Sequence, residues 1–176
     1  MTPISVTKQV ENTINLIPSE LSHFDEQAFF NRNGDTWSPA EQVKHLELAV
    51  KPLILAFRLP SFVLRLLFGK PNRPGRSYDE LLTKYHLKLS EGGKASAPYV
   101  PKALDTAAEK STVINDCLTR HHKMLKAANS YNDTNLDKYL LPHPLLGKIT
   151  LREMLFFTDF HIRHHLQSIQ QLYGNK

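Results

Sequence analysis

The sequence predicts an all-α fold: an antiparallel four-helix bundle with one long crossover between the second and third helices. Apolar residues recur at the three- to four-residue spacing of a helix over four long segments, and no stretch shows convincing alternation of apolar and polar residues. Helix start signals precede several of these segments. A chain of 176 residues can form one domain with a sizeable core, so we expect a single domain over residues 1–176.

Capping boxes mark the expected helix starts. In this motif a Ser or Thr side chain accepts a hydrogen bond from the backbone three residues later, and a Glu there returns one. The sequence contains four such pairs: Ser38/Glu41, Ser77/Glu80, Thr106/Glu109 and Thr150/Glu153. Pro39 follows the first N-cap, where its missing N–H has no cost.

The long helices are expected at about Pro3–Ile17, from Pro39 onward, at about Ala107–Asn129 and at Leu151–Tyr173. Pro18 should break the first helix, Pro52 could kink the second, and Pro60 should end or bend it. The crossover spans Gly69–Asp105 and holds a short helix from Tyr78 to about Leu89.

The formal charge is +5 with a pI near 9.3. This mild excess suits an anionic small-molecule substrate, with nearby arginines binding it, and lacks the dense basic stripe of a nucleic-acid binder. Arg65, Lys70, Arg73 and Arg76 cluster in a Pro/Gly-rich loop that we interpret as solvated. A single cysteine excludes an internal disulfide, and no signal peptide is recognisable, so we expect a cytoplasmic protein.

The stretch from Pro52 to Phe68 is apolar enough to resemble a membrane segment. Arg58, Arg65 and Pro60 argue against a span, because each Arg at mid-bilayer costs about 2.5–3.5 kcal/mol on insertion scales. We interpret the stretch as a buried helix end; the alternative is a partner-facing or membrane-surface patch.

The last helix carries three of the nine histidines within D-F-H-I-R-H-H-L-Q-S-I. His161 and His165 are four residues apart and fall inside its apolar stripe, whereas His164 lies towards the edge. Unpaired polar groups in a core cost roughly 1–3 kcal/mol, and a metal ion would supply one partner to both rings. His45, two turns into the second helix, is the best candidate for a third nitrogen. Three histidines with an open position form the pattern of a catalytic metal site, although core histidines bonded to one another remain an alternative.

Three further side chains are candidates for orienting the ligands: Glu41, Asp159 and His164. Glu41 lies four residues before His45 but is also the capping-box residue, which we take as its main role. Asp159 could bond a ring nitrogen or be a surface charge.

Other side chains could contribute to a pocket. Tyr85 and Tyr99 could close it from the crossover, and His143 could line its mouth. Cys117 and His121, four residues apart, could be a nucleophile and base, but we favour a packed thiol because Cys117 falls in the inward stripe. We expect Trp37 to cover the core.

The segments W-S-P-A-E-Q-V-K-H-L and H-P-L-L-G-K-I-T-L-R-E-M-L-F-F-T-D-F-H-I-R-H-H-L-Q-S-I together resemble the DinB-like superfamily. The resemblance implies a four-helix bundle in which His45, His161 and His165 bind one divalent ion, zinc or nickel, and it implies a homodimer. Characterised relatives include thiol S-transferases that use low-molecular-weight thiols, a mycothiol-dependent isomerase and amide hydrolases.

The resemblance therefore suggests a metal-dependent hydrolase or thiol transferase acting on a small, anionic or thiol-containing substrate. Water or a thiol at the metal would be the reacting group, and no catalytic side chain is identified. The alternative is a non-catalytic bundle, in which the metal is structural or the patch from Phe57 to Phe68 mediates self-association.

Overall fold

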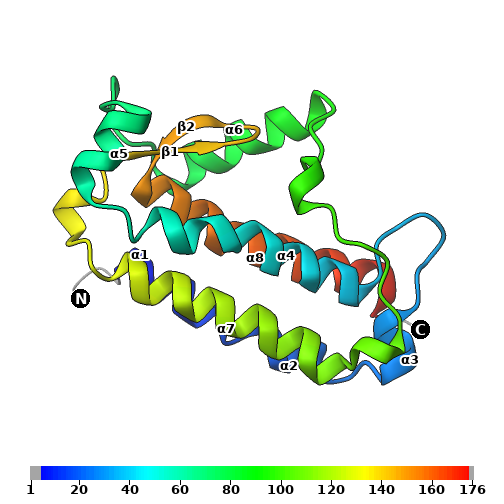
Figure 1. The fold of residues 1–176 in the computed structure, drawn as a ribbon. Helices are drawn as coiled ribbons and strands as arrows, with labels where there is room; N and C mark the ends of the chain where they lie inside the picture. The colour runs from blue at the N-terminus through cyan, green and yellow to red at the C-terminus, as the bar shows by residue number, and fades with distance from the viewer. Residues whose placement is uncertain (1–4, 175–176) are drawn as a thin grey trace.

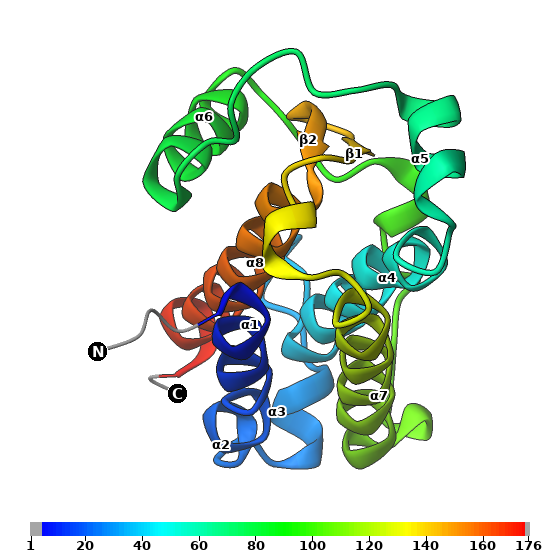
Figure 2. The same ribbon diagram turned by 90° about the vertical axis from the view of Figure 1, so that its left-hand side faces the viewer.

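The computed structural model describes residues 5–174 and is mostly helical, with one small sheet. Four helices pack side by side (Figures 1 and 2): α1 (Val6–Ile14), α4 (Pro39–Ala56), α7 (Lys110–Ala128) and α8 (Leu151–Tyr173). The shorter helices are α2 (Ile17–Leu21), α3 (Glu26–Phe30), α5 (Ser61–Phe68) and α6 (Tyr78–Ser90). Three 3₁₀ turns, η1 (Ala97–Tyr99), η2 (Thr106–Ala108) and η3 (Asp133–Asn135), and the strands β1 (Leu140–His143) and β2 (Gly147–Thr150) complete it.

The crossover between α4 and α7 decides the helix directions. It returns the chain to the end of the molecule where α4 began, so α4 and α7 run the same way, and α1 and α8 both run opposite to them (Figure 1). The expectation of antiparallel neighbours therefore holds for α4 against α8 and for α1 against α7. It is wrong for α4 against α7 and for α1 against α8, which also pack together.

One apolar cluster fills the space between these helices. Each long helix contributes a side chain that is at most 1% exposed: Ile14, Leu46, Met124 and Ile162. Burying a side chain of this size stabilises the fold by roughly 1.5–3 kcal/mol, so the apolar stripes read from the sequence hold the helices together.

Three of the four capping boxes form, at Ser38, Ser77 and Thr150. The box expected at Thr106 does not. Thr106 begins the short turn η2, and Glu109 follows it with a positive φ of 52°, so α7 starts only at Lys110. Because the left-handed residue separates the turn from the helix, Thr106 cannot cap α7.

One proline, Pro18, acts differently from expectation. Pro18 lies inside α2, in its first turn, and the break in the first helix falls before it, at Asn15 and Leu16. Pro52 lies within α4, which continues to Ala56, and Pro60 is the N-cap of α5. The expected start at Pro3 lies outside the described residues.

The expectation that no strands form was wrong. β1 and β2 pair antiparallel, with Leu141 opposite Ile149 and His143 opposite Gly147. Leu141 and Ile149 are buried, so the hairpin covers one end of the helical core and places His143 beside α8. Each strand has four residues and Pro142 interrupts the first, which leaves too short a pattern to show alternation.

In the described part of the chain, no helix combines the length and apolar character needed to cross a membrane.

Candidate metal centre

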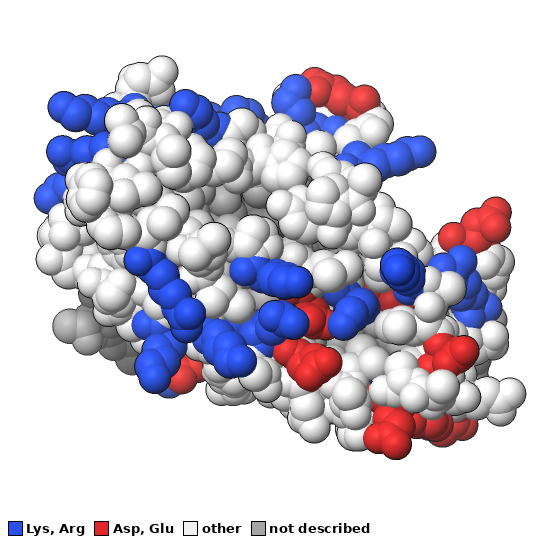
Figure 3. Space-filling model, viewed as in Figure 1, with Lys and Arg blue, Asp and Glu red and all other residues white. Residues whose placement is uncertain are grey.

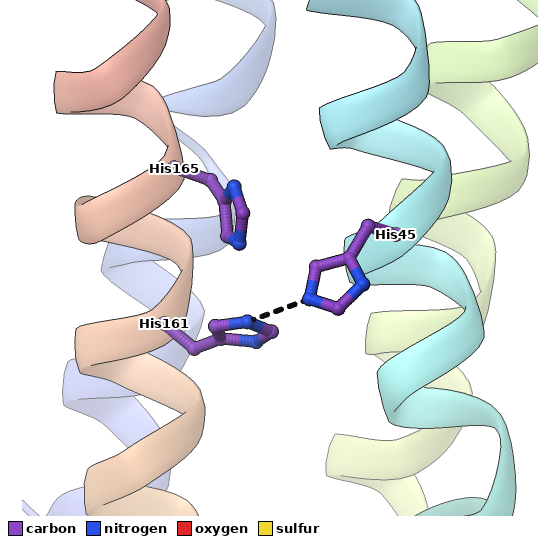
Figure 4. A group of neighbouring side chains, drawn as sticks. All are labelled: His45, His161 and His165. Atoms are coloured by element: carbon purple, nitrogen blue, oxygen red, sulfur yellow. Dashed lines mark hydrogen bonds between the residues drawn. The ribbon is translucent and has the colours of Figure 1, made fainter. Parts of the chain in front are cut away.

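Three histidine rings converge between α4 and α8 (Figure 4). His45 comes from α4, and His161 and His165 come from successive turns of α8. One nitrogen of each ring lies within 4.8 Å of the other two, and Nε2 of His45 is 3.0 Å from Nε2 of His161. The sequence placed His161 and His165 on the inward face of the last helix and offered His45 as the best third candidate, and the antiparallel packing of α4 and α8 brings the three together.

Backbone and amide oxygens orient two of the rings from outside. Nδ1 of His45 donates to the carbonyl oxygen of Tyr99 at 2.7 Å, and Nδ1 of His165 donates to Oε1 of Gln42 at 3.0 Å. Because carbonyl oxygens only accept, both hydrogens sit on Nδ1 and the Nε2 lone pair of each neutral ring is available. Metal-binding histidines are oriented by partners of this kind.

The site keeps its imidazoles neutral, which is the form that binds metal. Burial lowers the pKa of His45, and burial together with the neighbouring histidines lowers the pKa of His161 and His165 far more. Nitrogens bound tetrahedrally to zinc at about 2.0–2.1 Å lie about 3.3 Å apart. His45 Nε2 and His161 Nε2 are 3.0 Å apart, and all three nitrogens lie within 4.8 Å of one another, so small movements of the rings would bring the three around a single small divalent ion.

The three histidines line a cavity of about 690 Å³. Most of its wall is apolar and comes from α4, α8, η1 and the hairpin, with Leu53, Tyr99, Leu141 and Phe157 among the lining residues. Among the described residues of the wall, Lys94 alone carries a full charge. The cavity therefore suits a ligand with a substantial apolar part. Tyr85, Tyr99 and His143, the pocket candidates from the sequence, all line it.

Two arginines of the loop interpreted as solvated bond a buried carboxylate. Arg73 and Arg76 are only partly exposed and both bond the buried carboxylate of Glu153, at 2.8–3.2 Å. These bonds tie the loop before α6 to the start of α8, so the interpretation of Arg73 and Arg76 as solvated was wrong.

His143 presents a fixed hydrogen-bond donor to the cavity. Its Nδ1 accepts from the backbone N–H groups of Leu145 and Leu146, at 3.2 and 3.1 Å, which places the ring hydrogen on Nε2. Burial lowers the pKa of His143 to about 4, so the ring is neutral at physiological pH. It packs on Phe157, whose ring stacks on His161.

None of the three side chains proposed to orient the ligand rings makes a hydrogen bond to one of them. Glu41 is buried, bonds Arg32 and closes the capping box with Ser38, and makes no bond to His45. His164 lines the cavity with its ring centre 5.3 Å from that of His165 and makes no bond to a ligand candidate.

Asp159 is neither a surface charge nor a neighbour of the site. It is 1% exposed and faces α1 and α6, where it accepts from Thr13 at 2.5 Å and from Tyr78 at 2.8 Å. Arg163 also bonds it, from one turn later on α8. Other elements therefore pack on both sides of α8, whereas the single apolar stripe in the sequence predicted only one buried side.

Cys117 and His121 are buried together in α7, away from the cavity. Burial raises the pKa of the Cys117 thiol, which makes it a poor nucleophile. The expectation of a packed thiol is therefore confirmed.

Sequence reasoning missed three contributors. The Tyr99 carbonyl is a backbone atom without a sequence signature. Gln42 lies on the inward face of α4, three residues before His45, and a polar residue there was a usable signal. Trp37, expected to cover the core, lines the cavity with its ring centre 5.1 Å from that of His45.

Fold and site together define a helical protein with a three-histidine group able to hold a metal ion. The family model of the DinB superfamily matches residues 19–169, which include all three histidines, and the chain belongs to this superfamily. A search among curated proteins finds no match.

Proposed function

We propose that this protein is a metal-dependent enzyme in which His45, His161 and His165 bind one divalent ion, zinc or nickel. The observation that carries the proposal is the convergence of three neutral imidazole nitrogens on the wall of an apolar cavity. Three protein ligands are typical of catalytic zinc sites, whereas structural sites use four.

A bound divalent ion supplies Lewis acidity that activates a water molecule or a thiol. The chain's own residues do the remaining work. Tyr99 and Gln42 hold two ligand rings in orientation, and the apolar wall binds the apolar part of the substrate and excludes water. His143 donates its Nε2–H to a substrate oxygen without titrating near neutral pH. Hydrolysis and transfer of a low-molecular-weight thiol both fit this arrangement.

The same proposal includes the expectations about the helix arrangement, the cellular compartment and the oligomeric state. The packing of α1, α4, α7 and α8 supports a four-helix bundle whose first helix is divided into α1 and α2. The single, free and buried Cys117 supports a reducing compartment such as the cytoplasm. A homodimer remains a prediction from the resemblance.

One observation favours a non-catalytic protein instead. Within residues 5–174, every buried side-chain nitrogen and oxygen has a hydrogen-bond partner, and His45 and His161 satisfy one another without a metal. In this alternative the three histidines are a polar network of the core.

The test is the metal content of protein prepared without a histidine tag. We expect one divalent ion per chain, lost in a His45→Ala/His165→Ala variant and kept in a His23→Ala/His122→Ala control, whose histidines are exposed. Full retention by the first variant would refute the ligand assignment.

Activity then separates the two functions. Metal-loaded protein should transfer low-molecular-weight thiols to, or hydrolyse, apolar acyl compounds, and metal removal should abolish the reaction. A metal-loaded protein that is inert towards both substrate sets would favour the non-catalytic alternative.

A further inference from the structure

The end of α4 and the helix α5 expose a group of large apolar side chains. Leu55, Phe62, Leu66 and Leu67 are 67%, 70%, 81% and 57% exposed, and we call these four residues the α5 face. They are half of the large apolar side chains exposed in the described part of the chain. The interpretation of Pro52–Phe68 as a buried helix end thus holds for Phe57 and Leu64 and is wrong for the α5 face.

The surroundings of the α5 face are cationic. Between Glu47 and Asp79 the sequence contains no acidic residue and six basic ones, namely Lys51, Arg58, Arg65, Lys70, Arg73 and Arg76. Glu153 neutralises part of this charge through Arg73 and Arg76, but the other four cations are exposed. Lys and Arg dominate the end of the molecule that carries α5 and continue across this face, whereas acidic side chains lie mainly towards the opposite end (Figure 3).

The α5 face also adjoins the cavity. Leu55 belongs to both the α5 face and the cavity wall. Leu59, shortly before α5, and Phe68, the last residue of α5, also line the cavity. An apolar path therefore runs from the exposed face into the cavity wall.

We propose that the α5 face docks on an anionic lipid surface. Phe62, Leu66 and Leu67 enter the boundary between headgroups and acyl chains, while Arg58 and Arg65 contact lipid phosphates. Interfacial helices combine apolar and cationic residues in this way, and their affinity depends on anionic lipid. Without a helix able to span the bilayer among the described residues, contact is confined to the surface.

A second copy of the chain is a poorer occupant of the α5 face. A two-fold contact brings the same patch of both subunits together. Arg58 and Arg65 of both subunits would then lie in one shared interface, with no acidic residue in the surrounding stretch of chain to neutralise them. An anionic surface removes this repulsion.

The cavity then receives its ligand from the membrane, as an amphiphile whose apolar part follows Leu55 and Leu59 inward. This last step rests on the proposed function, whereas the docking itself does not require a metal.

The experiment is co-sedimentation with phosphatidylcholine vesicles, and with vesicles in which phosphatidylglycerol replaces part of that lipid. Metal-loaded and EDTA-treated protein are compared, so that failure at the metal site leaves the docking result readable. We expect both forms to bind the anionic vesicles and to bind phosphatidylcholine at least tenfold more weakly, with the difference shrinking at high salt.

Two variants separate the contributions. Phe62→Ser/Leu66→Ser should weaken binding about 100-fold, because two large apolar side chains lose their burial. Arg58→Gln/Arg65→Gln should weaken it about 30-fold. A Leu16→Ser/Leu87→Ser control, which changes exposed apolar residues outside the α5 face, should bind like the wild type.

Three results would overturn the proposal. One is no binding to anionic vesicles. Another is binding that Phe62→Ser/Leu66→Ser leaves unchanged, which indicates charge adsorption alone. The third is a dimer in light scattering that this variant converts to a monomer without affecting vesicle binding, which assigns the α5 face to self-association. Because Phe62 and Leu66 are exposed, the variant should keep the wild-type melting temperature and helical circular dichroism.

Discussion

Lowering the pH should destabilise this protein through His121, which is 1% exposed within α7. Burial lowers the pKa of His121 to about 4 in the folded chain, against about 6.5 when the chain is unfolded. Between these values the unfolded state binds more protons than the folded state. The contribution of His121 to stability is therefore complete above about pH 6.5 and is lost as the pH falls towards 4.

The expected size follows from the two pKa values. At pH 5 nearly all unfolded chains carry a proton on this ring, while about nine in ten folded chains carry none, so unfolding is favoured about 30-fold. This ratio corresponds to about 2 kcal/mol lost between pH 7.5 and pH 5.

Urea denaturation of the wild type and of His121→Gln at both pH values, in EDTA to remove metal, measures this loss. Gln keeps an amide donor for the Cys117 carbonyl, which Nδ1 of His121 bonds at 2.8 Å, and does not titrate. The wild type should lose about 2 kcal/mol more than the variant between the two pH values. Any fixed effect of the substitution cancels in that comparison, so equal losses would refute the reasoning.

Three further predictions concern the site and its support. Glu153→Ala should lower the free energy of unfolding by about 3 kcal/mol, because it removes a cap and charged hydrogen bonds around a buried carboxylate, as urea denaturation can measure. Gln42→Leu should weaken zinc binding 10–100-fold in calorimetry, since Nδ1 of His165 loses its acceptor. Nitrogen NMR should find His143 neutral, with its hydrogen on Nε2, at pH 7 and still largely so at pH 5.

Matched controls accompany these variants. Glu91→Ala removes an exposed pair with Lys88 and should change stability by less than about 1 kcal/mol. Gln167→Leu, at an exposed position of α8, should leave zinc affinity unchanged. The stability prediction would be contradicted if Glu153→Ala were as stable as Glu91→Ala. The zinc prediction would be contradicted by equal zinc affinity in Gln42→Leu and Gln167→Leu. A His143 ring that is protonated at pH 6 would contradict the NMR prediction.

The helices and the pair His161/His165 could be predicted because both depend on spacing along one helix, whereas His45 lies on another helix and was joined to the pair through the family resemblance. His161 and His165 must share a face, and a capping box such as Ser38/Glu41 is complete within four residues. The exception at Thr106 depends on the left-handed conformation of Glu109, which is rare for a non-glycine residue and is set by its surroundings.

Contacts between elements could not be predicted in the same way. Asp159 is buried because α1 and α6 cover the side of α8 that the apolar stripe left unassigned. The carbonyl of Tyr99 reaches His45 only because the crossover folds back over α4. Neither contact follows from the local sequence, because each needs the path of a long connection.

The central claim is that one metal ion is held by three particular nitrogen atoms. Anomalous X-ray diffraction from crystals of tag-free protein loaded with zinc tests it most directly. We expect one zinc peak per chain, about 2.0–2.1 Å from Nε2 of His45, His161 and His165. A peak bound elsewhere, or no peak between α4 and α8 at saturating zinc, would contradict the account.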